Sequence, residues 1–360
     1  MYKKLLTVLL VITLMLLGTS AVLAADAANG NLPNITIMAT GGTIAGSGAT
    51  TTTTVGYTAA VLGVDTLIAA VPELQKVANV TGEQFVQLAS ENMTNDIWLK
   101  LAKRVNALLA SPSVDGIVIT HGTDTLEETA YFLNLVVKSE KPVVLVGAMR
   151  PATALSADGP INLYNAVSVA GSKQAWSKGV LVCLNDTINS AREVTKGSTF
   201  LADTFRSPDL GCIGYIQGGK AYFYRESTRR HTVNSEFDVS SLTQLPRVDI
   251  VYGYANNSRA GLDAFVRAGA RGIVHAGVGN GSLFREVKDG LIDARKRGVA
   301  VVRSSRTGSG IVARNGEADD DALDFVAADT LNPQKARILL MLALTKTSDS
   351  GEIQRMFWEY

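Results

Sequence analysis

Residues 114–130 read Val-Asp-Gly-Ile-Val-Ile-Thr-His-Gly-Thr-Asp-Thr-Leu-Glu-Glu-Thr-Ala, and this stretch decides the fold class. Its apolar run, which begins at Gly116, is typical of a strand covered on both faces, and Leu126 to Val137 has the spacing of an amphipathic helix opened by acidic residues. Ligands of open α/β sheets bind outside the carboxyl ends of the strands. We therefore expect a small substrate to bind at Thr120 to Thr125.

The same strand and helix alternation continues on both sides of this stretch. Helical patterns fill most of the gaps between apolar strand-like runs, which predicts a mainly parallel sheet with crossover helices. The sequence thus predicts an α/β protein whose larger N-terminal domain contains this sheet and its flanking helices. The strand-like runs are Ile35–Ala39, Gly116–Ile119, Val143–Val146, Val180–Leu184 and Cys212–Ile216.

A second, smaller α/β domain is expected after a break in the pattern. Residues 225–246 lose apolar periodicity and gain polar and charged side chains, which is the composition of a linker. The alternation then restarts, so we predict an N-terminal domain over 25–224 and a C-terminal domain over 247–360. Its expected elements are strands at Val248–Tyr252, Gly272–His275 and Val299–Arg303, helices ending at Ala270 and Arg297, and a final helix over Asn332–Leu344.

The first residues have the pattern of a secretory signal. Lys3 and Lys4 precede an apolar run from Leu5 to Leu17, and Val22-Leu23-Ala24 provides a small-residue cleavage site. A run of about 13 residues is too short to span a bilayer comfortably, which favours a cleaved signal over a retained anchor. We expect residues 1–24 to be removed on export, and no membrane partner for the mature chain.

Composition and residue counts exclude several classes of function. The chain is 46% hydrophobic and 19% charged with a formal net charge of +1, so it lacks the basic surface of a nucleic-acid binder. The histidines His121, His231 and His275 are far apart, and no Cys or His pair has metal-ligand spacing. We predict no metal and no cofactor. Cys183 and Cys212 are expected to be free thiols, since Cys183 lies within a buried apolar run.

A second strand end also delivers a threonine after glycine. Residues 35–46 form a strand-like run followed by Gly41, Gly42 and Thr43, where the glycines allow backbone N–H groups to approach a ligand closely. A plain turn between a strand and a helix is the alternative reading of this segment by itself. Together with Thr123, however, Thr43 indicates two hydroxyl groups at neighbouring strand ends.

A hydroxyl nucleophile without a histidine needs another base. No Gly-x-Ser-x-Gly elbow occurs in the sequence, which leaves lysine and tyrosine as bases. Lysine and tyrosine have reference pKa values near 10, so a protein must perturb them for use near neutral pH. Lys196 and Tyr57 are the candidates, although each by itself also fits a surface lysine or a packing tyrosine.

These residues carry a resemblance to a known family. The sequence resembles, from end to end, the bacterial type II (periplasmic) L-asparaginases, a group that includes glutaminase-asparaginases. Its two signatures are Ala-Thr-Gly-Gly-Thr-Ile-Ala at 39–45 and Ile-Thr-His-Gly-Thr-Asp-Thr-Leu-Glu-Glu-Thr-Ala at 119–130. Further matching blocks are Gly147–Pro151, Ser156–Pro160 and Thr330–Arg337.

The resemblance implies a threonine nucleophile. Thr43 matches the threonine of the family's flexible loop, Tyr57 matches its activating tyrosine, and Thr123 with Lys196 and Asp124 matches a second, more rigid set. A hydroxyl of this kind attacks the side-chain amide, ammonia leaves from an acyl-enzyme, and water releases aspartate. The implied catalytic residues are Thr43, Tyr57, Thr123, Asp124, Lys196 and Glu317.

The resemblance also implies how the substrate is held and how the subunits assemble. Ser90 and Glu91 match the pair that binds the α-carboxylate and α-amine, and Asp124 also contacts the amine. In relatives, the residues that match Ser282 and Glu317 reach the active site of a neighbouring subunit, where Glu317 would orient Tyr57. The resemblance therefore implies a homotetramer built of dimers. It also implies periplasmic localisation. The implied substrate-binding residues are Gly42, Ser90, Glu91, Thr123, Asp124, Ala148 and Ser282.

Two departures from the strict asparaginase pattern bear on the substrate. Glu91 and Ser282 stand where strict asparaginases often carry Gln and Asn, and relatives with this pairing tend to hydrolyse glutamine as well. One methylene in a pocket discriminates by only about 1 to 3 kcal/mol, so dual activity needs no change of mechanism. The alternatives to an L-asparaginase with secondary glutaminase activity are a glutaminase-dominant enzyme and a periplasmic amino-acid binding protein.

Overall fold

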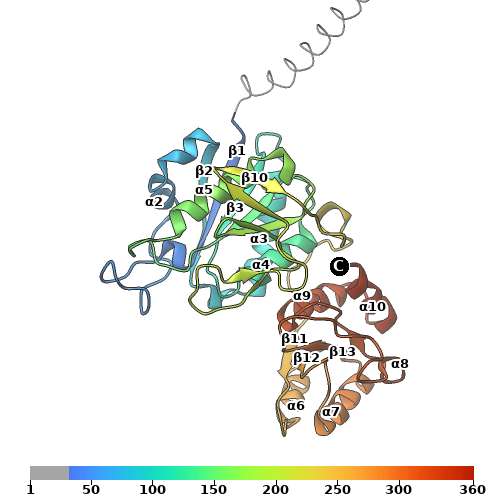
Figure 1. Cartoon of the computed structure of the whole chain (residues 1–360). Coiled ribbons are helices and arrows are strands. Elements are labelled where there is room, and N and C mark those ends of the chain that lie inside the picture. Colours follow the sequence, from blue (N-terminus) through green and yellow to red (C-terminus); the bar gives the residue numbers. More distant parts are fainter. Residues whose placement is uncertain (1–31) are drawn as a thin grey trace, which may run out of the picture.

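The computed structural model describes residues 32–360, which form two α/β domains (Figure 1). The predicted signal peptide at 1–24 lies outside the described residues. The larger N-terminal domain contains a mainly parallel sheet with helices on both faces, and the smaller C-terminal domain contains a second parallel sheet. The predicted fold class is therefore confirmed.

The N-terminal sheet has eight strands in the order β10-β9-β6-β5-β4-β3-β1-β2. Strands β2, β1, β3, β4 and β5 are parallel, whereas β6, β9 and β10 are antiparallel to their neighbours. The strands are β1 (Asn34–Gly41), β2 (Asn79–Leu88), β3 (Gly116–Thr120), β4 (Val143–Val146), β5 (Val180–Leu184), β6 (Thr187–Ser190), β9 (Gly214–Gln217) and β10 (Lys220–Phe223), with a separate pair β7 (Thr195–Lys196) and β8 (Phe205–Arg206).

One strand differs from its expected extent and direction. The run predicted over 212–216 begins as strand β9 only at Gly214 and forms an antiparallel hairpin with β10. Gly218 and Gly219, both with positive φ, make the tight turn between them. The edge strand β2 was not predicted, because its half-exposed polar and apolar residues give no continuous apolar run.

Helices cover both faces of the N-terminal sheet because its central strands are apolar on both sides. In β3, Ile117 and Ile119 pack on the face covered by α3 (Asn95–Leu109) and α4 (Leu126–Val136), whereas Val118 faces the opposite side. That side is covered by α2 (Val64–Ala69) and α5 (Gly159–Ala170). Short 3₁₀ turns lie at Thr43–Ala45, Pro72–Lys76, Ser90–Asn92, Lys173–Ala175 and Thr232–Asn234.

The C-terminal sheet has four parallel strands in the order β11-β12-β13-β14. Its strands are β11 (Val248–Tyr252), β12 (Gly272–Gly277), β13 (Ala300–Ser305) and β14 (Val326–Ala327), and its helices are α6 (Ala260–Arg267), α7 (Arg285–Lys296), α8 (Asp320–Leu323), α9 (Pro333–Ala343) and α10 (Ser350–Glu359). The helix expected as the last one is α9. The additional helix α10 was not predicted, although its buried residues Ile353, Met356 and Phe357 have the i, i+3, i+4 spacing of an amphipathic helix.

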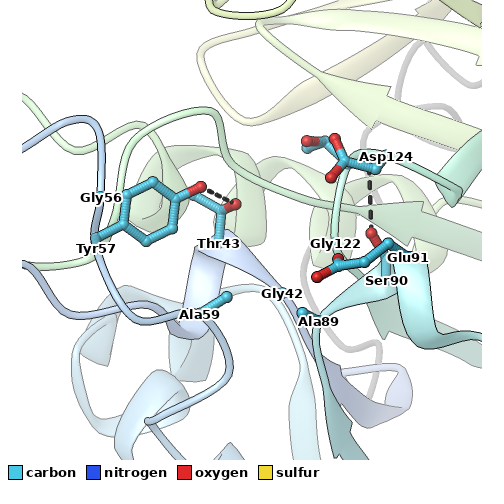
Figure 2. A pocket seen from close by; sticks show the side chains of 11 residues that line it. Gly42, Thr43, Gly56, Tyr57, Ala59, Ala89, Ser90, Glu91, Gly122 and Asp124 are labelled. Atoms are coloured by element: carbon cyan, nitrogen blue, oxygen red, sulfur yellow. Dashed lines mark hydrogen bonds between the residues drawn. The ribbon is translucent and has the colours of Figure 1, made fainter.

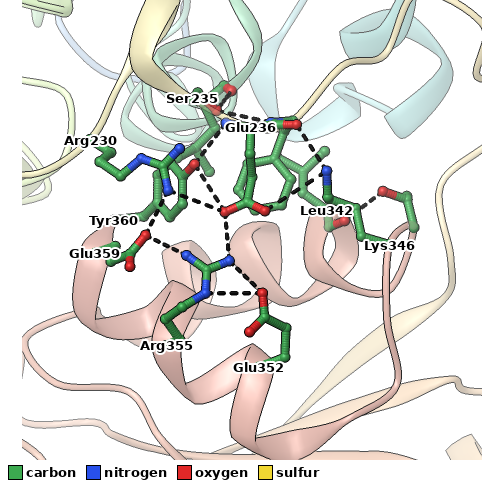
Figure 3. Close-up of polar contacts among 12 residues, drawn as sticks. Arg230, Ser235, Glu236, Leu342, Lys346, Glu352, Arg355, Glu359 and Tyr360 are labelled. Atoms are coloured by element: carbon green, nitrogen blue, oxygen red, sulfur yellow. Dashed lines mark hydrogen bonds and ion pairs between the residues drawn. The ribbon is translucent and has the colours of Figure 1, made fainter.

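The segment between the domains is irregular and anchored. Residues 225–246 contain one 3₁₀ turn, but Phe237 and Val239 are buried in the main core. Glu236 accepts a hydrogen bond from Arg355 at 2.8 Å, and its backbone N–H donates to Tyr360 Oη at 2.7 Å (Figure 3). The segment is thus held against α10 by packing and by charge.

Contacts across the domain boundary fix the two domains together. Helix α9 packs on α4, and one apolar core includes residues of both domains. Lys335 Nζ, at the start of α9, donates to the backbone carbonyls of Arg192 (2.8 Å) and Val194, and burial lowers the pKa of Lys335 to about 8. Over residues 32–360, no helix is both long and apolar enough to cross a membrane.

Candidate active site

A cavity of about 280 Å³ opens beside the carboxyl ends of β1 and β3 (Figure 2). This is the sheet edge at which the sequence predicted a ligand site, and the pairing of β1 with β3 brings the two glycine-threonine turns together. The cavity is lined by Gly42, Thr43, Gly56, Tyr57, Ala59, Ala89, Ser90, Glu91, Gly122, Thr123 and Asp124.

The turn after β1 presents Thr43 to the cavity. Gly41 and Gly42 have φ values of 108° and 82°, a region that residues with a Cβ rarely adopt, and they turn the chain so that Thr43 begins a 3₁₀ turn. Thr43 Oγ1 lies 2.6 Å from Tyr57 Oη. Tyr57 reaches this position because Ser47 and Thr58 pair as a short antiparallel bridge, which folds the loop between them back over the turn.

The two strand-end turns touch through their glycines. A Cβ built on Gly42 would lie 2.2 Å from Gly122 Cα and 2.3 Å from Gly122 N. A Cβ on Gly122 would lie 2.6 Å from Ser90 Oγ. A side chain at position 42 would collide with backbone atoms, and one at position 122 would require Ser90 to shift, so glycine is what allows the turns of Thr43 and Thr123 to share one cavity.

Thr123 accepts a hydrogen bond from a lysine, and the residue after Thr123 in the sequence is an aspartate. Lys196 Nζ, from the short strand β7, donates to Thr123 Oγ1 at 2.9 Å and to Asp124 Oδ1 at 2.6 Å. The Lys196 side chain is 17% exposed and that of Asp124 is 61% exposed. Lys196 is therefore largely enclosed behind Thr123, while the Asp124 carboxylate remains open to a ligand.

The opposite side of the cavity is polar and acidic. Ser90 is buried, its Oγ accepts a hydrogen bond from Asp124 N at 3.2 Å, and its carbonyl accepts one from Thr125 Oγ1 at 2.8 Å. The neighbouring Glu91 is exposed. In Figure 2, Ser90, Glu91 and Asp124 lie together, across the cavity from Thr43 and Tyr57. A ligand with a charged head and an uncharged tail would fit between the two groups.

His121 has a structural environment rather than a catalytic one. Its Nδ1 lies 2.7 Å from the carbonyl of Gly122, and its Nε2 lies 2.9 Å from Thr129 Oγ1, to which Trp98 Nε1 donates at 2.8 Å. A carbonyl only accepts and an indole only donates, so His121 is the neutral Nδ1-protonated tautomer and Thr129 donates to Nε2. Burial lowers the pKa of His121 to about 4, which agrees with this neutral form.

Besides the lysine described above, three residues of the expected site do not line this cavity. Ala148 is buried beyond the end of β4 and is not among the cavity-lining residues. Ser282 and Glu317 belong to the C-terminal domain, where Ser282 forms a short bridge with Val278 and Glu317 is exposed. Within one chain, neither of these two residues lines the cavity beside Thr43.

Sequence reasoning missed several residues that shape the site. Gly56, Ala59 and Ala89 line the cavity, and their small size gave no chemical signal. Trp98 and Thr129 were given no role, since the chain of hydrogen bonds from Trp98 through Thr129 to His121 depends on the packing of α3 against α4. Between residues 32 and 360, no cluster of three or more His, Cys, Asp or Glu side chains has the arrangement of a metal site.

This arrangement is typical of an enzyme that attacks a carbonyl carbon with a side-chain hydroxyl group. Residues 34–229 match the family described as "Asparaginase, N-terminal", and residues 247–357 match the "Glutaminase/Asparaginase C-terminal domain". The chain belongs to the asparaginase family.

Relatives of this chain match it over nearly the whole of both sequences. It is 59% identical to "L-asparaginase 2" of Bacillus subtilis (92% of this chain, 87% of the relative) and 56% identical to "Glutaminase-asparaginase" of Pseudomonas fluorescens (91% of each). It is 53% identical to "Probable L-asparaginase periplasmic" of Haemophilus influenzae (99% of each). A crystal structure of "Probable Cytoplasmic L-asparaginase" from Campylobacter jejuni superposes with a TM-score of 0.89 at 52% identity, covering 91% of this chain and all of that one.

Proposed function

We propose that this protein is an L-asparaginase that hydrolyses L-asparagine to L-aspartate and ammonia, with secondary activity on L-glutamine. The observation that carries the proposal is the pair of hydroxyl groups at one cavity, Thr43 with Tyr57 at 2.6 Å and Thr123 with Lys196 at 2.9 Å. Membership of the asparaginase family supports the same reaction.

The proposed nucleophile is Thr43. Tyr57 in its deprotonated form accepts the Thr43 proton as Oγ1 bonds to the carbonyl carbon of the side-chain amide, which gives a tetrahedral intermediate. The C–N bond then breaks, the nitrogen takes up the proton, and ammonia leaves an ester on Thr43. Water attacks this ester and releases the free acid and the Thr43 hydroxyl. Thr123, held by Lys196, positions and polarises the reacting groups.

The acidic side of the cavity is proposed to bind the amino-acid head. Ser90 would donate to the α-carboxylate, and the carboxylates of Glu91 and Asp124 would face the α-ammonium. Lys196 already pairs with Asp124 Oδ1, which leaves the other carboxylate oxygen for the substrate. Gly42 and Ala148 complete the proposed substrate-binding set, Gly42 through its place in the cavity wall. With the head held there, the amide points towards Thr43.

Glutamine is proposed as the second substrate. Glutamine is longer than asparagine by one methylene. Glu91 and Ser282 suggest that the cavity has room for it, because relatives with this pairing tend to hydrolyse glutamine as well. A relative named glutaminase-asparaginase is 56% identical to this chain, which supports the proposal. A higher kcat/KM for glutamine than for asparagine would make the protein a glutaminase-dominant enzyme instead.

Ser282 and Glu317 are proposed to act in a neighbouring subunit. They lie in the C-terminal domain, outside the cavity of their own chain, and would complete the partner's cavity in a homotetramer built of dimers, where Glu317 would orient Tyr57. We propose catalytic and C-terminal domains over 25–224 and 247–360, joined by the segment 225–246.

We also propose export to the periplasm, on the strength of the signal-like N-terminus. One relative is named periplasmic and one structural neighbour is named cytoplasmic, so the names of relatives leave the location open. Fractionation of cells expressing the full chain tests it: the mature protein should appear in the periplasmic fraction, shortened by about 24 residues.

Side-by-side ammonia release from L-asparagine and L-glutamine by the purified full chain tests the activity. We expect kcat/KM to be higher for asparagine. Thr43→Ala should abolish turnover, and Tyr57→Phe should lower kcat by about 10² to 10⁴-fold, the usual contribution of a positioned acid or base. Thr54→Ala, an exposed threonine of the same loop, is the matched control and should leave kcat unchanged. Ammonia release that persists in Thr43→Ala would show that another residue is the nucleophile.

A further inference from the structure

A fully buried ion pair in the C-terminal domain lies where no catalytic role has been assigned. Arg303, on β13, and Asp320, at the start of α8, both have side chains with 0% exposure. Arg303 Nε and Nη2 donate to the two carboxylate oxygens of Asp320, each at 2.6 Å. A buried pair of this kind is weak evidence for stability, because desolvation offsets much of the attraction between the charges.

The remaining donors of Arg303 reach two loops. Arg303 Nη1 donates to the carbonyls of Asn280 (3.2 Å) and Gly281 (3.1 Å), and Nη2 donates to the carbonyl of Ala313 (3.1 Å). An arginine side chain has five N–H groups, and all five are used here. Few other buried side chains could meet so many backbone oxygens at once, since lysine has three donors and no fixed fork.

The two loops are those that carry Ser282 and Glu317. Gly281, whose carbonyl Arg303 binds, directly precedes Ser282. Asp320 Oδ2 accepts the backbone N–H of Asn315 at 2.8 Å, two residues before Glu317. Asn280 Oδ1 also accepts from Ala313 N at 2.9 Å, which joins the loops directly.

We infer that the Arg303–Asp320 pair is a positioning device that fixes Ser282 and Glu317 relative to each other for use in the partner's active site. The inference rests on the proposed function, in which these two residues act across the subunit interface. Neither Arg303 nor Asp320 touches substrate. They act by holding the loop backbones, so their loss should misplace Ser282 and Glu317 without removing either.

The test uses a double variant that can still fold. Arg303→Met with Asp320→Leu replaces both members of the pair by apolar side chains, which avoids leaving a single buried charge without its partner. The tetramer should persist, and kcat/KM for asparagine should fall by about 10 to 100-fold, the scale expected for a misplacement of roughly 1 Å. Arg303→Lys, which keeps the charge but loses the fork, should show the same loss. The control Arg259→Met removes a pair with Asp263 and Asp293 that contacts neither loop, and should leave kcat/KM unchanged.

Mixed tetramers separate this role from a general structural one. Subunits of the double variant, reassembled with Thr43→Ala subunits, should regain activity, because an intact Thr43 then meets intact loops from the other subunit. With random mixing in a two-fold dimer, about a quarter of the sites should be restored. A general structural defect would not be repaired by an inactive partner, so an absence of gain overturns the inference. If the double variant does not assemble, Arg303→Lys subunits enter the same experiment.

A parallel mixture distinguishes the positioning role of Arg303 from the proposed role of Glu317 in the partner's active site. Glu317→Ala subunits reassembled with Thr43→Ala subunits should also regain activity. If this mixture recovers and the Arg303 mixture does not, only the positioning role is wrong. If neither mixture recovers, the proposal that Glu317 acts in the partner's site is wrong, and the positioning role for that site is overturned with it.

Discussion

Gly122→Ala offers a sharp test of the contact between the two strand-end turns. The φ of Gly122 is not positive, so alanine introduces no backbone strain of the left-handed kind. The added Cβ would nevertheless lie 2.7 Å from Ser90 Cβ and 2.6 Å from Ser90 Oγ. Carbon atoms in contact prefer at least about 3.5 Å, so Ser90 has to move by about 0.8 Å.

The size of the effect follows from this movement. Overpacking of this kind costs about 1 to 3 kcal/mol of stability. A misplacement of about 1 Å at a substrate-positioning residue costs about 100-fold in rate, equivalent to roughly 2.7 kcal/mol of transition-state stabilisation. Because Ser90 is proposed to hold the substrate head in the ground state as well, most of the loss should appear as a higher KM.

The assay combines ammonia release over a range of asparagine concentrations with urea unfolding. Gly261→Ala is the matched control, since its Cβ on α6 would meet no atom within 4 Å. It should stabilise the protein by about 0.5 to 1 kcal/mol and leave the kinetics unchanged. A Gly122→Ala enzyme with wild-type kcat/KM and stability would refute the steric reasoning.

Three further predictions concern buried polar groups and thiols. Burial lowers the pKa of His275 to about 4, so as pH falls below about 6.5 the unfolded chain binds a proton that the folded chain does not. Relative to His275→Leu, the wild type should therefore lose about 2 kcal/mol of unfolding free energy between pH 8 and pH 5. Parallel profiles of urea midpoint against pH for the two proteins would contradict this. Thr129→Val should cost about 2 to 4 kcal/mol in urea unfolding because Trp98 Nε1 and His121 Nε2 both lose their partner, whereas Thr129→Ser should retain most of the stability. Cys183 and Cys212 are free, and burial raises the pKa of Cys183, so a thiol reagent should modify Cys183 only after denaturation; its rapid reaction in the native protein would disprove the burial.

The sequence by itself was sufficient for the fold class and for the positions of the two threonines. Strands such as β3, β4 and β5 are continuous apolar runs because both faces are covered, and this local pattern identifies them without a partner. Thr43 and Thr123 follow such runs directly, so their place at strand ends could also be inferred. The antiparallel strand β6 has no comparable local signal.

What only the tertiary structure decided is which polar groups meet. Lys196 is 73 residues from Thr123 in the chain and Tyr57 is 14 from Thr43, and their hydrogen bonds depend on strand order and loop path. The neutral tautomer of His121 is set by the Gly122 carbonyl at Nδ1 and by the Thr129 hydroxyl at Nε2, and the Trp98 indole orients that hydroxyl. Arg303 likewise gains its five acceptors only where two loops and α8 converge. Apolar periodicity is a local property of the chain, whereas hydrogen-bond geometry requires distant segments to be packed in register, which no short stretch of sequence encodes.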